Sequence, residues 1–128
     1  MLAKSINLGT TLLVLLMIGG LSSCGGGNSA ECRHRAAALN ARVEEIKHKA
    51  HDTLKIGSTR DEVTRFYNEN DIPLTFDRSG ARGTIGTTGC SPVGCGSNDA
   101  IIGVSVPLDS SGKVNAEPYV MAMYTDCL

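Results

Sequence analysis

The residues whose types and spacing come closest to a chemical site are Glu44, His48 and His51, at positions i, i+4 and i+7. On a helix this spacing places them along one side, where two imidazoles and a carboxylate are suitable zinc ligands. The apolar stripe of the same segment is centred on Val43 and Ile46, about a quarter turn away. Lysine and arginine residues are interspersed with the three. We therefore interpret them as a solvated charged flank, with a metal or hydrolase site as the alternative.

No other pattern in the chain indicates catalysis. None of the serines sits in a Gly-x-Ser-x-Gly elbow, so a nucleophile with a positioned base is not indicated. The glycine-rich run 83–89 lacks the Gly-Lys-Ser/Thr ending and the strand-to-helix setting of a phosphate-binding loop. We expect a protein that is not an enzyme and that holds no metal or other cofactor.

The cysteines provide more specific chemistry, and there are five: Cys24, Cys32, Cys90, Cys95 and Cys127. If the first is modified, the remaining four predict two disulfides in an exported domain, with three possible pairings. We favour Cys90 with Cys95, across a short Pro- and Gly-containing loop, and Cys32 with Cys127. The second bridge would enclose nearly the whole domain and contribute nominally about 4–5 kcal/mol. A four-cysteine zinc site is the alternative, but only Cys90 and Cys95 approach the pair spacing of such sites.

The first 23 residues have the organisation of a secretory signal peptide. Lys4 gives a basic start, residues 11–18 form an apolar run, and residues 21–23 are Leu-Ser-Ser, directly before Cys24. Leu-Ser-Ser-Cys resembles the lipobox of bacterial lipoproteins, and this resemblance implies that Cys24 becomes the acylated first residue of the mature chain and carries palmitate. An uncleaved membrane helix is the alternative. The apolar run is short and interrupted, whereas a span needs about 20 apolar residues.

The residues that follow Cys24 bear on the location of the protein. In many Gram-negative lipoproteins Asp at the next position retains the protein at the inner membrane, so Gly25 implies the outer membrane, with the domain facing the periplasm. Residues 24–30 are glycine-rich and are predicted to be a flexible tether, whose span is about 5–6 Å times the square root of its length. Membrane lipid is therefore one expected partner.

Residues 31–128 suffice for one small domain. The mature chain keeps all 13 Asp and Glu residues and loses only Lys4 from the 12 Lys and Arg residues, which leaves a formal charge of −2. Charges of both signs are interspersed, which argues against a nucleic-acid partner. The chain has no Trp, 3 Tyr and 2 Phe, so its core is expected to be thin and reinforced by the disulfides.

Hydrophobic spacing predicts two helices followed by three strands. Apolar residues three and four apart mark a helix over residues 31–54, and the capping-box sequence from Thr59 to Glu62 starts a second helix that ends near residue 70. Alternation marks strands at 72–76, 102–108 and 113–124, with a turn at 109–112. Residues 78–98 are predicted to be loop with one weak strand at 84–88. The expected fold class is α+β, two helices packed on a three-stranded antiparallel sheet.

Residues 54–63, Leu-Lys-Ile-Gly-Ser-Thr-Arg-Asp-Glu-Val, resemble the SmpA/OmlA family of BamE-like lipoproteins, whose pattern is hydrophobic-x-hydrophobic-Gly-x-Thr-x-x-(Gln/Glu)-Val. The family's later strand–turn–strand matches residues 104–114, so the resemblance covers 54–114. It implies an ααβββ fold, shared with beta-lactamase-inhibitor-like domains, and an accessory role in outer-membrane protein assembly. The chain departs from the family at residues 69–73, lacks the aromatic-rich first strand and adds the cysteine loop.

We therefore expect an envelope lipoprotein that acts as a non-catalytic protein-binding module, an assembly or scaffold accessory. The alternative is an inhibitor or immunity lipoprotein that binds a toxin or an enzyme, because a disulfide-rigidified loop loses little entropy on binding. Met121, Met123 and Tyr124 are a candidate partner surface, although we favour ordinary core packing of the last strand for all three.

Overall fold

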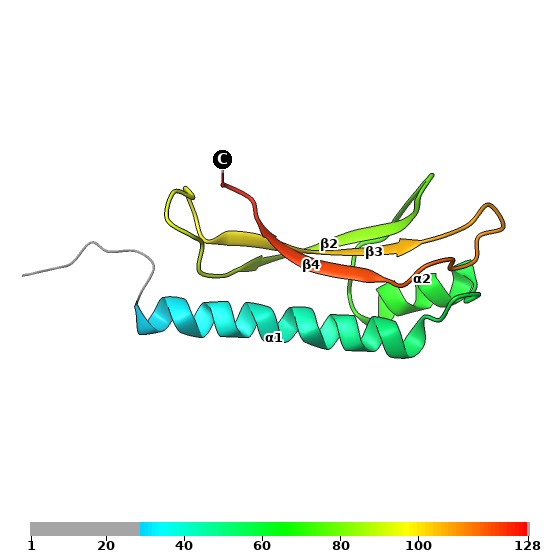
Figure 1. The fold of residues 1–128 in the computed structure, drawn as a ribbon, viewed down its shortest axis with the longest axis horizontal. Coiled ribbons are helices and arrows are strands. Elements are labelled where there is room, and N and C mark those ends of the chain that lie inside the picture. The colour runs from blue at the N-terminus through cyan, green and yellow to red at the C-terminus, as the bar shows by residue number, and fades with distance from the viewer. Residues whose placement is uncertain (1–28, 128) are drawn as a thin grey trace, which may run out of the picture.

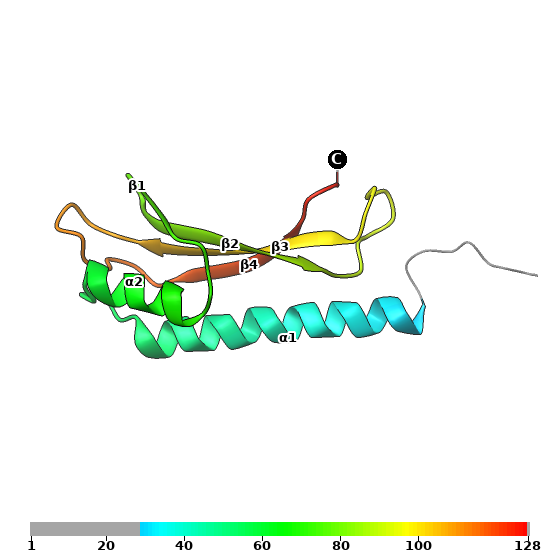
Figure 2. The same ribbon diagram turned by 180° about the vertical axis from the view of Figure 1, so that it is seen from behind.

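The computed structural model describes residues 29–127. The predicted signal peptide, Cys24 and most of the predicted tether lie outside the described residues. The elements follow the order α1 (Ala30–Thr53), α2 (Arg60–Glu69), β1 (Thr75–Asp77), β2 (Gly80–Thr88), β3 (Asp99–Pro107) and β4 (Tyr119–Tyr124). Both helices lie on one side of an antiparallel sheet with strand order β1-β2-β3-β4 (Figures 1 and 2). The α+β class is confirmed, whereas the sheet has four strands and not three.

Helix α1 forms as its apolar spacing predicts. The side chain of Ser29 caps its first turn by accepting a hydrogen bond of 3.1 Å from the backbone N–H of Cys32. The predicted stripe faces the sheet, and its buried members in the helix are Cys32, Leu39, Ile46 and Ala50. Gly57, with a φ of +93°, lies in the turn that follows. Burial of this stripe holds the helix against the sheet, because the opposite side is exposed and carries mainly charged, polar and alanine residues.

Helix α2 begins with the predicted capping box. The backbone N–H of Thr59 donates to Glu62 Oε2 over 2.6 Å, and the backbone N–H of Glu62 donates to Thr59 Oγ1 over 3.3 Å. The first of these hydrogen bonds is the main reason that the pKa of the Glu62 carboxyl is lowered. The helix buries Val63, Phe66 and Tyr67, as the sequence predicts.

Strand β2 is the largest departure from the predicted elements. Residues 80–88 form a nine-residue strand between β1 and β3, where the sequence predicts loop with a weak strand at 84–88. The strand lacks a hydrophobic signature because two of its helix-facing residues, Ala81 and Gly83, are small. A Cβ atom at Gly83 would lie 2.6 Å from Ile72 Cγ2 and 2.8 Å from Tyr67 Cε1, and closer still to the Pro73 carbonyl oxygen. Glycine at position 83 lets Tyr67 pack directly against the strand backbone.

The other strands are shifted from their predicted bounds. β1 covers only Thr75–Asp77, because the backbone N–H of Ile72 is still bonded to the Tyr67 carbonyl at the end of α2. The predicted strand 113–124 is restricted to Tyr119–Tyr124, with one isolated bridge between Leu108 and Val114. The predicted turn at 109–112 is confirmed, since the N–H of Gly112 donates to the Asp109 carbonyl over 3.0 Å.

Candidate functional site

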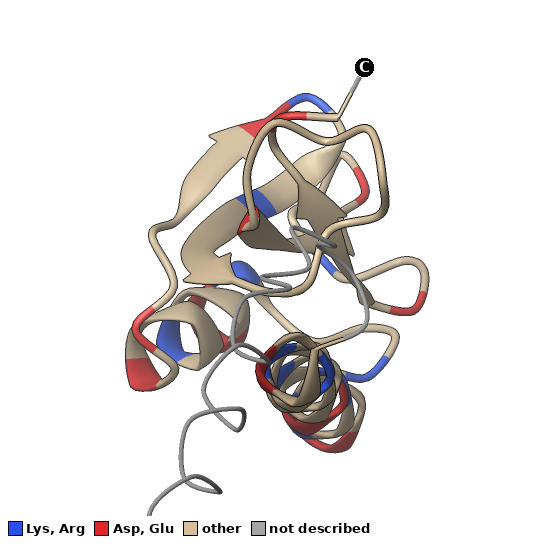
Figure 3. Ribbon diagram, turned by 90° about the vertical axis from the view of Figure 1, so that its left-hand side faces the viewer, with Lys and Arg blue, Asp and Glu red and all other residues tan. Residues whose placement is uncertain are grey.

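The two helices cover one face of the sheet and leave the other face open. Figure 3, seen along α1, shows both helices on the same side of the sheet, with charged residues around the helices and few on the strands. On the open face, the strand register places Ser105 between Arg82 and Tyr119, and Gly103 between Thr84 and Met121. We call this surface the outer face; its members are Arg82, Thr84, Gly86, Ile101, Gly103, Ser105, Tyr119, Met121 and Met123.

The outer face is hollowed and apolar on the β4 side. A cavity of about 340 Å³ lies over β2, β3 and β4, and its walls include Tyr119, Met121 and Met123. Gly103 lies among the residues that line the hollow, and because it carries no side chain the floor between Thr84 and Met121 stays open. Tyr119 is 59% exposed and Met123 is 43% exposed. A depression lined by two methionines and a tyrosine can adapt to an apolar side chain of a partner.

The expectation that Met121, Met123 and Tyr124 pack in the core is wrong for the two methionines, which lie on the outer face. Tyr124 lies on the helix side, where its hydroxyl accepts from the Cys90 N–H over 3.0 Å and donates to the Cys90 carbonyl over 2.8 Å. Sequence reasoning also overlooked Ile101 and Tyr119. Alternation along β3 and β4 contains the signal for both, but the face is recognisable only once β2 is known to be a strand.

Arg82 forms a fixed polar rim on the β1 side of the outer face. Its Nε lies 3.0 Å from Asp77 Oδ2, and its Nη2 donates to Ser79 Oγ over 2.9 Å. Hydrogen bonds from Ser79 to Asp77, aided by the Arg82 charge, hold the pKa of the Asp77 carboxyl below its usual range. The Arg82 side chain is 60% exposed, so it remains accessible to a partner while its position is held.

The four described cysteines form two disulfides, but the expected pairing is wrong. Cys32 is joined to Cys90, with Cα atoms 5.0 Å apart, and Cys95 is joined to Cys127, with Cα atoms 4.3 Å apart. Since all four thiols are bonded in pairs, the zinc alternative also fails. The reason lies in the sheet. The end of β2 brings Cys90 over the start of α1, and the end of β4 brings Cys127 beside Cys95, where the N–H of Gly96 donates to the Asp126 carbonyl over 2.8 Å.

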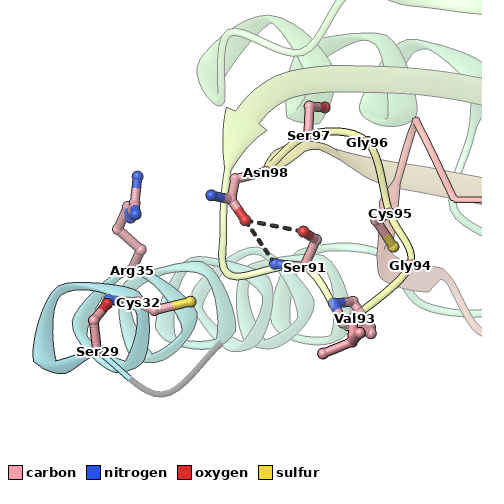
Figure 4. A pocket seen from close by; sticks show the side chains of 11 residues that line it. Ser29, Cys32, Arg35, Ser91, Val93, Gly94, Cys95, Gly96, Ser97 and Asn98 are labelled. Carbon is pink, nitrogen blue, oxygen red and sulfur yellow. Dashed lines mark hydrogen bonds between the residues drawn. The ribbon is translucent and has the colours of Figure 1, made fainter. Parts of the chain in front are cut away.

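Residues 89–98, which we call the cysteine loop, are held in shape from within. The backbone N–H and the hydroxyl of Ser91 both donate to Asn98 Oδ1 over 2.9 Å (Figure 4). The N–H of Gly89 donates to the Asn98 carbonyl over 2.9 Å. A hollow of about 390 Å³ lies between this loop and the start of α1, beside Arg35. Val93 stands at the tip of the loop with 93% of its surface exposed.

Glu44, His48 and His51 are not gathered into a metal-binding group. Glu44 is exposed and pairs with Lys47 at 3.7 Å, His48 is exposed, and His51 is half-buried. Within residues 29–127, no three histidine, cysteine or acidic side chains come together in a group able to hold a metal ion. The interpretation as a solvated flank therefore agrees with the exposure of Glu44 and His48.

No family model, no curated protein and no solved structure matches this chain. The resemblance to the SmpA/OmlA family therefore stays an expectation from the sequence. Among the described residues, none of the helices combines the length and the apolar character that crossing a bilayer requires.

Proposed function

We propose that this protein is an envelope lipoprotein, acylated at Cys24, that binds another envelope protein through the outer face of its sheet and catalyses no reaction. The observation that carries the proposal is the combination of a hollowed apolar surface with the lack of any described element over it. Contiguous exposed apolar surface on a small domain marks an interaction site more often than it is incidental. The partner is expected to insert an apolar side chain between Tyr119 and the methionines.

Lipid attachment is the first part of the proposal to test. Cells that express the full chain are labelled with an alkyne analogue of palmitate, and the Cys24→Ser variant serves as the control. We expect label in the wild type and none in the variant, with the wild type floating with outer membranes. Equal labelling of both chains, or a protein that retains Met1 in the envelope fraction, would show that Cys24 is not the acylated residue.

Partner binding is tested by photo-crosslinking in living cells. A photoreactive amino acid replaces Met123 on the outer face or, as a matched control, His48 on the exposed side of α1. We expect a discrete protein adduct from position 123 that is absent from position 48. An adduct of the same mass from both positions, or none from position 123, contradicts the use of the outer face.

The identity of the adduct separates the two functions that the sequence suggests. A component of outer-membrane protein assembly supports the scaffold or assembly accessory, which we favour because of the BamE-like segment at residues 54–114. A single toxin or enzyme supports the inhibitor or immunity lipoprotein. The second candidate is kept because two disulfides hold the cysteine loop, and a surface that is rigid before binding loses little entropy when it binds.

A further inference from the structure

We propose that the tip of the cysteine loop, Pro92, Val93 and Gly94, is a second membrane contact that seats this end of the domain on the bilayer. The inference rests on the proposed acylation of Cys24 and adds a defined orientation to it. The surface recognised is the interfacial region of a phospholipid leaflet, which accepts an apolar side chain beneath its headgroups.

The length of chain between Cys24 and the fold limits where the bilayer is. Ser29 is the fifth residue after Cys24, and a fully extended chain covers at most about 3.6 Å per residue. The start of α1 therefore lies within about 18 Å of the acylated residue. The helix itself has 24 residues and extends about 36 Å at about 1.5 Å per residue, so its far end is carried well away from the anchor.

The cysteine loop lies at the end of the molecule that the anchor holds. The bridge from Cys32 to Cys90 fastens the loop to the first turn of α1, with Cα atoms 5.0 Å apart. Figure 1 shows this loop, in yellow, at the same end as the start of α1. The bridge from Cys95 to Cys127 ties the other side of the loop to the residues after β4, so both sides of the tip that carries Val93 are covalently attached to the domain.

The chemistry of the tip fits a lipid surface. Val93 is the most exposed large hydrophobic residue in the described part of the chain, at 93%, and its neighbours Pro92 and Gly94 are also exposed and uncharged. The exposed side chains beside the tip include Arg33 but also Glu31 and Asp126, so the contact depends on the apolar tip and not on a basic patch. One valine binds a membrane weakly by itself. Because the acyl chains already hold the domain at the surface, the second contact becomes intramolecular and a weak interaction is sufficient.

The absence of tryptophan from the sequence allows a direct test with single reporters. Val93→Trp places an indole at the proposed contact, and Ile56→Trp, the control variant, places it beyond the far end of α1, on a residue that is 71% exposed. The acylated mature protein is reconstituted into vesicles of phosphatidylethanolamine and phosphatidylglycerol with brominated acyl chains. We expect at least twofold quenching of the Val93→Trp indole relative to unbrominated vesicles, and no quenching in Ile56→Trp. Equal quenching in both variants, or none in Val93→Trp, overturns the contact.

A second measurement keeps the unsubstituted valine. Amide hydrogen exchange at residues 91–96 is expected to slow at least threefold when the acylated wild-type protein is on vesicles, with no change at residues 55–58. Unchanged exchange at 91–96 overturns the contact even if the Val93→Trp indole is quenched, because quenching would then reflect the introduced side chain. Protection of 91–96 that requires an added envelope protein overturns it as well, since the loop would then contact that protein.

The failure of this inference is distinguishable from the failure of the lipoprotein proposal. A Val93→Trp protein that carries the acyl mass and floats with vesicles, but shows no quenching, overturns only the loop contact. Protein without acyl mass, or without flotation, overturns the anchor, and the loop contact with it.

Discussion

The two faces of the sheet are formed by the same strands but differ in how closely they are packed, and neighbouring residues of β3 show the difference. Ile102 lies on the helix side and is 0% exposed, whereas Ile101 lies on the outer face and is partly exposed. Glycines differ in the same way. A Cβ atom at Gly83 would overlap Tyr67 and Ile72, whereas one at Gly86 would meet nothing within 4 Å. One face is therefore filled to the limit of its volume, and the other has space that a partner can fill.

The largest expected contrast comes from removing one isoleucine from each face. Ile102→Ala leaves a cavity among fully buried side chains and is expected to lower the free energy of unfolding by about 3 kcal/mol. Ile101→Ala shortens a side chain that is already partly exposed to solvent, and it should lower the free energy of unfolding by less than about 1 kcal/mol. Urea unfolding of both variants, with disulfides intact and serine at position 24, measures the difference. Equal losses would mean that the outer face is covered in the native protein.

The glycine pair gives the next largest effect. Gly83→Ala forces a methyl group against Tyr67 and the Pro73 carbonyl, so we expect a loss of about 1–3 kcal/mol. Gly86→Ala meets no atom and should change the free energy of unfolding by no more than about 0.5 kcal/mol. Thermal unfolding of the two variants provides the comparison. A stable Gly83→Ala protein would show that Tyr67 can retreat from β2.

Tyr67 connects α2 to the helix-facing side of the sheet. Its hydroxyl group donates toward two carbonyl oxygens, that of Ala81 at 3.2 Å and that of Val104 at 3.1 Å. Tyr67→Phe removes this donor while keeping the ring in place, and a loss of about 1 kcal/mol is expected in urea unfolding. The phenol bridges β2 and β3, so its removal should also raise amide exchange at the centre of both strands.

The same residue predicts a dependence on alkaline pH. Burial raises the pKa of the Tyr67 phenol, so the folded protein keeps a proton that the unfolded chain releases at about pH 10. The stabilisation is therefore complete below about pH 10, and the free energy of unfolding falls as the pH rises above it. Urea unfolding between about pH 8 and pH 11 should show a shallower decline for Tyr67→Phe than for the wild type. If the free energy of unfolding fell equally steeply with pH in both proteins, the pH dependence would come from groups other than Tyr67.

The smallest effect on stability is expected on the outer face itself. Met123 is already 43% exposed and lies outside the core, so the free energy of unfolding of Met123→Lys should stay within about 0.5 kcal/mol of the wild type. The adduct that forms when the photoreactive group replaces Tyr119, across the same hollow, should nevertheless be lost in the Met123→Lys background. If that adduct still formed at wild-type yield, the hollow would not be required for partner binding.

The difference between the faces also explains which parts of the structure the sequence predicts. Both helices depend on local signals, the α1 stripe and the Thr59 capping box, and the predicted bounds agree with the structure within a few residues. Strand β2 carries no such signal. Its helix-facing glycine is set by the bulk of Tyr67, which belongs to a distant segment, so alternation of apolar and polar residues is lost.

The error in the disulfides follows from the same strand. Without β2, residues 78–98 are a free connection, and proximity in sequence favours pairing Cys90 with Cys95. With β2 in place, the two cysteines lie on opposite sides of the cysteine loop. Cys90 is bonded to Cys32 in α1, and Cys95 is bonded to Cys127 after the end of β4. The outer face escaped prediction for this reason too, because a surface formed by three strands is not visible when one of them is assigned to loop.

The observed connectivity has a consequence for how the molecule matures. Read from the N-terminus, the four described cysteines pair in the order in which they are synthesised, Cys32 with Cys90 and Cys95 with Cys127. If the Cys24 thiol is blocked by the proposed acylation, a chain that enters an oxidising compartment amino end first meets each correct partner as the next cysteine to arrive. Sequential oxidation alone would produce the native arrangement, and reshuffling by an isomerase would not be required.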